Sequence, residues 1–235
     1  MVYFSYYLTF GEGSLSHPSP NTTMLQGDAD WWRLAATISD EDRAAVIQHN
    51  ADVEPEYRLY QSLGAVPCVG AIMTAPVVLL LSHPALDGQS TPNDYSFYRP
   101  GWPLSALHPE APSGIVERWR NRVTALVDRF GAQHVSNAVA AVFLNPWRSF
   151  AFADRLRLPS RARMLGLAAS AASRDAILLI PRYQDLWTEH AVIASLPSTR
   201  RFNSRWWQAT ELSERNLGDD AWATLCRRIE THAWI

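Results

Sequence analysis

The pattern of apolar and polar positions along the chain changes at about residue 76. From there on, short runs of aliphatic residues alternate with longer stretches in which apolar residues recur every three or four positions. A short run that is apolar on both faces predicts a strand buried in a parallel sheet, and the longer spacing predicts a helix packed on that sheet. The runs that predict strands are residues 77–81, 138–144, 176–180 and 191–196.

Helices are predicted between and after these strands, over residues 114–130, 160–173 and 219–232. This alternation predicts an α/β fold over residues 66–235, a three-layer α/β/α sandwich with a central four-stranded parallel sheet and right-handed crossovers. Residues 1–65 lack the alternation. They are predicted to form a helical and loop-rich N-terminal extension that packs on the core.

Each predicted strand stops at proline and polar residues. Those that follow the four runs are Ser82, His83 and Pro84, then Asn145 to Ser149, then Pro181, Arg182 and Tyr183, and finally Pro197 to Arg200. The carboxyl ends of parallel strands share one edge of a sheet, and ligands bind at that edge in open α/β folds. The sequence therefore predicts a site there. The alternative is a set of ordinary loops, with His83 as a partly exposed loop residue.

Residues 88–112 form a long connection that contains five prolines. Its aromatic residues are Tyr95, Phe97, Tyr98 and Trp102. A loop of this length inside a compact domain is usually functional or disordered, and its aromatic residues argue against disorder. The loop is predicted to bind a ligand. The alternative is a covering flap whose rings pack on the sheet.

All 21 basic residues are arginines, so the chain has no lysine and no side-chain amine for a Schiff base. Codon bias in a GC-rich genome is the simple explanation. The arginines are nevertheless clustered, because residues 115–210 hold 14 arginines against 6 acidic residues, whereas residues 1–114 hold 4 against 12. Such a block predicts a surface that faces a polyanion.

The composition also argues against several classes of protein. No apolar stretch predicts a membrane span and the N-terminus lacks the basic start of a signal peptide, so a cytoplasmic protein is expected. The two cysteines, Cys68 and Cys226, are too few for a four-cysteine metal site, and the seven histidines show no metal-ligand spacing. No metal and no cofactor are expected.

The order of these strands and motifs resembles that of the uracil-DNA glycosylase superfamily, over roughly residues 66–207. The matching segments are Leu81 to Pro84 at the family's Asp-Pro or Asn-Pro motif, Asn145 at its base-reading asparagine, and SLPSTRRF, with Pro197, Ser198 and Arg200, at its His-Pro-Ser motif. Two residues depart from the family pattern. His83 replaces the water-orienting Asp or Asn, and Leu196 replaces the family histidine.

The resemblance implies a monofunctional DNA glycosylase that flips a base out of double-stranded DNA and hydrolyses its N-glycosidic bond. The chain length and the aromatic loop narrow it to a phage-defence branch whose members excise α-glucosylated hydroxymethylcytosine. A monomer without lyase activity is expected. The alternatives are a uracil or damaged-base repair glycosylase, a non-catalytic nucleic-acid-binding protein with this fold, and an enzyme of free nucleosides or other small glycosides.

The resemblance also implies roles for individual side chains. Asp87 is expected to aim the attacking water, with His83 sharing that role, and Asn145 is expected to read the base edge. The expected base and sugar pocket comprises Ser82, Tyr95, Phe97, Tyr98, Trp102 and Trp147. The expected DNA contacts come from Arg148, Arg182, Ser198, Arg200 and Arg201, with Arg200 filling the vacated stack. The alternatives are a turn cap for Asp87, a backbone-bonded ring for His83, and a solvated surface role for any one arginine.

Overall fold

The computed structural model describes residues 31–86, 99–204 and 211–232, and its centre is a mixed sheet of five strands. The strands are β1 (Cys68–Val69), β2 (Val77–Leu81), β3 (Val139–Phe143), β4 (Ile177–Ile180) and β5 (Arg201–Asn203). Their order is β1-β3-β2-β4-β5, and every pair is parallel except β1 with β3. The predicted α/β class is confirmed, but the sheet has five strands, one of them antiparallel, in place of the four parallel strands predicted.

The helices lie before, between and after the strands. They are α1 (Trp31–Asp52), α2 (Ser113–Phe130), α3 (Ala132–Ala138), α4 (Arg161–Ser173), α5 (Gln184–Trp187), α6 (Ala191–Ala194), α7 (Glu214–Leu217) and α8 (Asp219–Glu230). Short 3-10 turns lie at Pro55–Tyr57, Gln61–Leu63 and Ser105–Leu107. The helices predicted after the first two strands and at the C-terminus are confirmed to within two residues at each end.

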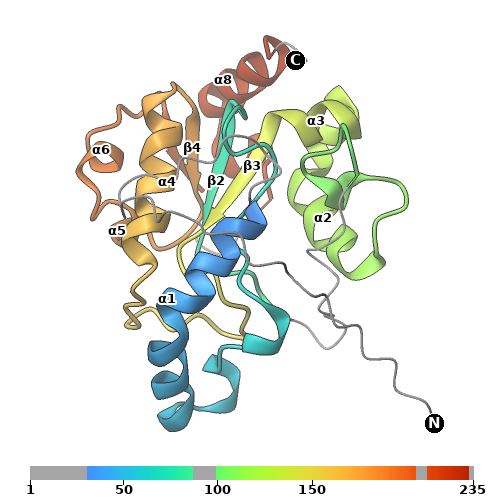
Figure 1. Cartoon of the computed structure of the whole chain (residues 1–235). Helices are drawn as coiled ribbons and strands as arrows, with labels where there is room; N and C mark the ends of the chain where they lie inside the picture. Colours follow the sequence, from blue (N-terminus) through green and yellow to red (C-terminus); the bar gives the residue numbers. More distant parts are fainter. Residues whose placement is uncertain (1–30, 87–98, 205–210, 233–235) are drawn as a thin grey trace, which may run out of the picture.

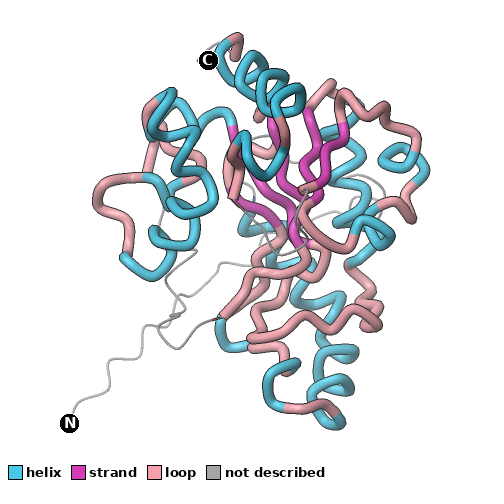
Figure 2. Tube along the Cα trace, turned by 180° about the vertical axis from the view of Figure 1, so that it is seen from behind, coloured by secondary structure: helices cyan, strands magenta, loops and turns pink. Residues whose placement is uncertain are grey.

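Successive side chains of β2 point to opposite faces of the sheet, and each face has its own hydrophobic core. Val78 and Leu80 belong to one core, with residues of α1, α4, α5 and α6, whereas Val77, Leu79 and Leu81 belong to the other, with residues of α2, α3 and α8. Figure 1 shows α2 and α3 on one side of the strands and α4 on the other, and Figure 2 shows the strands between helices from behind. Burying each aliphatic side chain is worth roughly 1.5–3 kcal/mol, so β2 anchors both cores.

The prediction of a fourth strand at residues 191–196 is wrong. Residues 191–196 contain α6, whose first turn is capped by His190, because the ring Nδ1 accepts a hydrogen bond from the Val192 N–H at 3.3 Å. The place beside β4 is taken by β5, which pairs Arg201 with Leu178. A short apolar run does not by itself distinguish a turn of buried helix from a strand, and the polar residues of β5 do not predict one.

The described part of the N-terminal region contains one long helix and two short turns. Helix α1 begins at Trp31, and residues 55–63 contain two separate 3-10 turns. Ile38 and Val46 of α1 lie in the same core as α4. These contacts pack α1 on one face of the sheet.

A buried carboxylate holds α1 in place. Asp42 is 0% exposed, and its oxygens accept hydrogen bonds from the Trp147 Nε1 at 2.8 Å, the Ser160 hydroxyl at 2.7 Å and the Ser160 N–H at 2.9 Å. Trp147 follows β3 and Ser160 precedes α4. Asp42 therefore joins α1 to the whole connection between β3 and α4, which forms part of the site described below.

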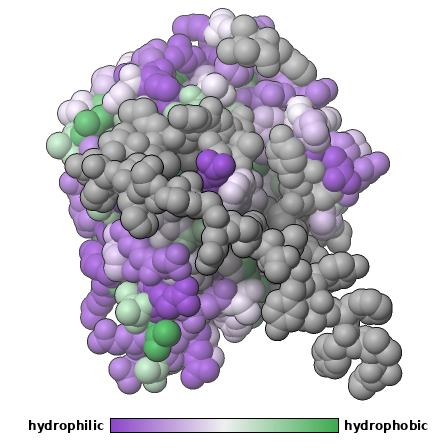
Figure 3. Space-filling model, viewed as in Figure 1, coloured by the Kyte–Doolittle hydropathy of each residue, from purple (hydrophilic) through white to green (hydrophobic). Residues whose placement is uncertain are grey.

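The described surface is mainly polar. Figure 3 shows that the visible face, where grey atoms do not cover it, is largely hydrophilic with scattered apolar residues. The large exposed apolar residues are Trp32, Ile47, Phe150 and Val192. Of the helices in the described ranges, none is long and apolar enough to cross a membrane.

Candidate functional site

The connections that leave the sheet diverge between β2 and β4. Strand β2 is joined to β3 through α2 and α3 on one face, whereas β4 is joined to β5 through α5 and α6 on the other. Such a topological switch opens a crevice at the carboxyl ends of the two strands, where ligands bind in open α/β sheets. The residues that follow these strands include His83 after β2 and Arg182 after β4.

His83 is held between the loop after β2 and the loop after β3. Its Nδ1 lies 3.1 Å from the Ser82 hydroxyl, and its ring stacks on that of Phe152 with centroids 5.6 Å apart. The two loops are joined by a hydrogen bond from the Asn145 N–H to the Ser82 carbonyl at 2.9 Å. The imidazole is therefore fixed in the crevice by neighbours on both loops.

Burial lowers the pKa of His83 to about 4. A backbone hydrogen bond with Ser149 raises the pKa, and the charges of Arg118 and Arg182 lower it. The Nε2 is buried, and within the described residues no partner meets full hydrogen-bond geometry there. A buried polar atom with incomplete hydrogen bonding costs about 1–3 kcal/mol, which favours a water or a ligand that completes it.

The protonation state of His83 limits its chemistry. At pH 7 the ring is neutral, because its pKa lies about three units lower. General bases work best when their pKa is close to the operating pH, so this imidazole is a weak proton acceptor. It is suited to hold a water molecule or a substrate by a hydrogen bond.

Asn145 lies beside His83 at the end of β3. Its side chain is buried, and its Oδ1 accepts a hydrogen bond from the Trp147 N–H at 3.0 Å, as in an Asx turn. No hydrogen bond of its Nδ2 is found within the described part of the chain. The Nδ2 donor, and the second lone pair of Oδ1, remain for a ligand.

Two aromatic rings border the histidine. Phe152, which stacks on His83, also contacts Tyr183 with ring centroids 4.7 Å apart. Tyr183 follows β4 and has a left-handed backbone with φ 55° and ψ 46°. This conformation costs on the order of 1–3 kcal/mol for a bulky residue, and such strain tends to cluster at functional sites.

The same two rings open into a pocket of about 620 Å³. Its polar and aromatic lining residues are His49, Tyr57, Phe152, Asp154, Arg155 and Tyr183. Ligand sites commonly measure roughly 300–1,000 Å³ and combine apolar walls with a few polar groups. This pocket therefore has the size and the lining for a flat, hydrogen-bonding ring.

Two arginines act on the site. Arg182 is exposed at the end of β4, and Arg118 of α2 donates from its Nη1 to the Ala85 carbonyl. Both lower the pKa of His83, so their charges reach the crevice. Arg182 was predicted from the sequence, whereas Arg118 was missed. Helix α2 contains several arginines, and nothing in their positions along the helix distinguishes the one that faces the site. Tyr183 was detectable, since it stands in the segment that follows a predicted strand.

Several predicted pocket residues lie elsewhere. Trp147 and Arg148 are 2% and 1% exposed, and the Trp147 indole faces Asp42 under α1. Neither side chain presents the surface expected of a pocket wall or a phosphate contact. Trp102 packs on the core formed with α2, α3 and α8, with its ring centroid 5.1 Å from that of His108. Its position fits the covering flap.

Ser198, Arg200 and Arg201 lie at the opposite edge of the sheet. Because β5 is parallel to β4, the residues at the start of β5 and those before it are at the amino ends of the strands. Arg200 lies 3.2 Å from Asp175 through its Nε, and Arg201 donates to the Ile193 carbonyl at 3.0 Å. The SLPSTRRF segment is therefore not joined to His83 and Asn145. The residues at the carboxyl end of β5 are Asn203 and Ser204.

Four predicted site residues, Asp87, Tyr95, Phe97 and Tyr98, lie outside the described residues. Within the residues that are described, no group of three or more His, Cys, Asp or Glu side chains is placed to hold a metal ion.

No protein-family model, no curated protein and no solved structure matches this chain. A function for it must therefore be inferred from the geometry and chemistry of the site.

Proposed function

We propose that this chain is a DNA glycosylase of the uracil-DNA glycosylase superfamily, with a three-layer α/β/α fold. One observation carries the proposal. The loops that carry His83 and Asn145 are hydrogen-bonded to each other at the carboxyl ends of β2 and β3, next to the switch point between β2 and β4, and the resemblance places the water-orienting and base-reading residues at these two positions. Helices on both faces of the sheet support the proposed fold.

In the proposed reaction, a water oxygen attacks C1′ of the deoxyribose. The bond from C1′ to the base nitrogen breaks, its electron pair leaves with the base, and a proton of the water passes to a carboxylate. The sugar gains positive charge in the transition state, so a nearby carboxylate contributes most at that point. Asp87 is the proposed acceptor, and His83, neutral at pH 7, holds the water.

The neighbouring pocket suits the flipped base. Tyr57, Phe152 and Tyr183 offer aromatic surfaces for stacking. His83 and Asn145 do not line this pocket; His83 adjoins it through Phe152, on which its ring stacks. A volume of about 620 Å³ accommodates a base with a bulky substituent. The proposed substrate is accordingly the α-glucosylated hydroxymethylcytosine of phage DNA, and the proposed setting is antiviral defence in the cytoplasm, by a monomer.

The DNA backbone is proposed to approach the same edge. Arg118 and Arg182 supply positive charge there, and positive charge favours the phosphates of the DNA backbone.

A non-catalytic DNA-binding protein is the second candidate. The observation that favours it is that no described carboxylate is among the groups that shift the pKa of His83. If Asp87 does not supply one, the site binds a base without hydrolysing its bond.

The deciding experiment incubates the purified chain with plain, uracil-containing and glucosylated phage DNA, and detects abasic sites as strand breaks after alkali. Base release from the glucosylated DNA supports the proposal, and strand breaks before alkali or a borohydride-trapped adduct contradict the absence of lyase activity. Saturable binding without release indicates the non-catalytic protein. Release from free nucleosides alone indicates an enzyme of small glycosides.

A further inference from the structure

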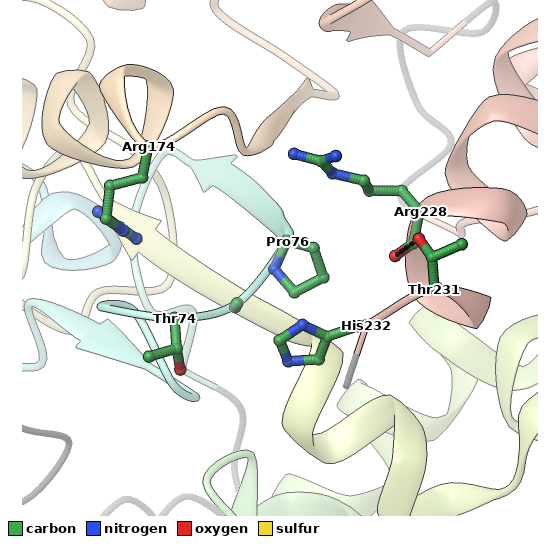
Figure 4. Close-up of a pocket in the computed structure, with 7 residues that line it drawn as sticks. Thr74, Pro76, Arg174, Arg228, Thr231 and His232 are labelled. Atoms are coloured by element: carbon green, nitrogen blue, oxygen red, sulfur yellow. Dashed lines mark hydrogen bonds between the residues drawn. The ribbon is translucent and has the colours of Figure 1, made fainter. Parts of the chain in front are cut away.

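A second pocket lies at the amino edge of the sheet, on the far side from His83. It measures about 210 Å³ and is lined by Thr74, Pro76, Arg174, Arg228, Thr231 and His232, among others. The five residues of β2 separate the two edges, which is roughly 15 Å at 3.3 Å per residue. Figure 4 shows Arg174 and Arg228 reaching in from opposite sides, with Pro76 between them and His232 below.

The two arginines differ in their hydrogen-bond partners. The Nη2 of Arg228 donates to the Asp175 carboxylate at 2.5 Å and to the Asp175 carbonyl at 2.6 Å. Arg174 donates only to the Ile72 carbonyl, at 2.5 Å, and no carboxylate pairs with it within the described residues. Burial lowers the pKa of Arg174, so part of its hydration is lost without a compensating anion.

The remaining polar groups of the pocket are neutral. Burial, followed by the nearby His134 and Arg228, lowers the pKa of His232, so at pH 7 the ring is mainly neutral and offers one N–H as a donor. The hydroxyls of Thr74 and Thr231 also border the pocket. Hydroxyl, imidazole and guanidinium donors around a small cavity are the groups that bind oxyanions.

The groups around the pocket keep a net positive charge after their ion pair with Asp175 and the helix C-termini are taken into account. Arg200 and Arg228 share one carboxylate, Asp175, and Arg174 pairs with none among the described residues, so two positive charges are not compensated. Helices α4 and α8 both end at this edge, and each C-terminus contributes roughly half a negative charge. About one positive charge is left for a ligand.

We propose that this pocket is a binding site for a small phosphate-bearing anion. The Arg174 guanidinium and the free donors of Arg228 hold the phosphate oxygens, and Thr74, Thr231 and His232 donate the remaining hydrogen bonds. At about 30 Å³ per water molecule, the cavity has room for one such group and a few waters. The site is independent of the proposed glycosylase activity, because it uses none of the residues at the carboxyl edge.

The test is a titration of the full chain with inorganic phosphate at constant ionic strength, followed by calorimetry and by the rise in Tm. Arg174→Gln is expected to weaken phosphate binding by about tenfold or more, the value of one charge-assisted hydrogen bond. Arg174→Lys keeps the positive charge but loses the paired N–H donors of the guanidinium. Its affinity for phosphate should therefore lie between those of the wild type and Arg174→Gln. Arg120→Gln is the matched control, because Arg120 is an exposed arginine of α2 outside the pocket.

The source of the phosphate is resolved by two further titrations. A 5′-mononucleotide that binds more tightly than phosphate identifies a nucleotide ligand, whereas a short DNA duplex that displaces phosphate identifies the nucleic-acid backbone. Absence of saturable phosphate binding, or equal affinities in the wild type and a folded Arg174→Gln variant, would overturn the proposal. Neither result depends on base release, so the proposed function is tested separately.

Discussion

The carboxyl and amino edges of the sheet both carry arginines, yet they use them differently. At the amino edge, Arg200 donates to the Ala172 carbonyl at the end of α4 and Arg201 to the Ile193 carbonyl of α6, and Arg200 also lies against Asp175. At the carboxyl edge, Arg118 and Arg182 surround a neutral His83. Helices of a parallel α/β fold end near the amino edge and begin near the carboxyl edge. Arg200 and Arg201 therefore compensate carbonyls and a carboxylate at the amino edge, where Arg174 has no carboxylate partner among the described residues, whereas Arg118 and Arg182 add positive potential at the carboxyl edge.

This difference changes how the arginine-rich block of the sequence is interpreted. Residues 115–210 were expected to provide one polyanion-facing surface, but the sheet divides their arginines between two edges about one strand length apart. A charge block in a sequence is thus no evidence for a single patch when strands intervene. The predictions below set variants at one edge against variants at the other.

The largest expected effect concerns base release. Asp87→Ala should lower the single-turnover rate by about 100-fold or more, because positioned acid–base groups contribute 10²–10⁴. Binding of DNA that carries the modified base should survive, as filter binding will measure. Arg174→Gln at the amino edge should release base at the parental rate. If Asp87→Ala also does so, Asp87 is not the water-activating group, and His83 and Asn145 are the next residues to substitute.

Substitutions of the two aspartates that join elements near the edges, Asp42 and Asp175, should differ in their effect on the free energy of unfolding. Asp42→Ala should cost about 3–5 kcal/mol of unfolding free energy, because it strands the donors of Trp147 and Ser160 in the core. Asp175→Asn should cost no more than about 1 kcal/mol, because that side chain is 62% exposed and asparagine tolerates its φ of 71°. Urea unfolding measures both. Equal losses of unfolding free energy in the two variants would show that the burial of Asp42 does not make its hydrogen bonds more important for stability than those of Asp175.

The sequence predicts the centre of this fold well and its margins poorly. The apolar run of residues 77–81 has no periodicity compatible with an exposed face, and it forms β2 with the expected bounds. Strand β1 has only two residues, between Pro67 and Gly70, and its pairing with β3 depends on Gly70, where a Cβ would lie 2.6 Å from the Val139 carbonyl oxygen. Such a short edge strand leaves no pattern in the sequence.

The candidate site was predicted only as far as it follows the strands. His83, Asn145 and Arg182 come directly after β2, β3 and β4, so the rule that binding residues follow parallel strands finds them. Phe152 and Arg118 are brought in by tertiary packing, from a loop and a helix face without local signals. The error at residues 191–196 had the largest consequence, because it moved Ser198 and Arg200 to the wrong edge.

Acid should destabilise the protein through the carboxyl-edge histidine. His83 takes up a proton near pH 6.5 when unfolded but only near pH 4 when folded, so the unfolded state binds more protons between these values and stability falls as the pH drops through them. The loss should reach about 3 kcal/mol at pH 4. His83→Gln should remove this part of the pH dependence in urea unfolding. His232→Gln should remove a smaller part, because the pKa of His232 is lowered in a more exposed position.

The smallest expected effect decides which edge faces DNA. Arg182 is exposed beside His83, whereas Arg201 is half-buried and bound to the carbonyls of Ile193 and Ala194 at 3.0 and 2.8 Å. Removing one phosphate contact lowers the slope of log affinity against log salt by about 1 and weakens binding evenly across sequences. Arg182→Gln should do this, and Arg201→Gln, which keeps a donor for the same carbonyls, should leave both slope and affinity unchanged. Fluorescence anisotropy between about 50 and 200 mM salt gives both quantities. A reduced slope for Arg201→Gln alone would move the DNA face to the amino edge and remove the support that Arg118 and Arg182 lend to the proposed function.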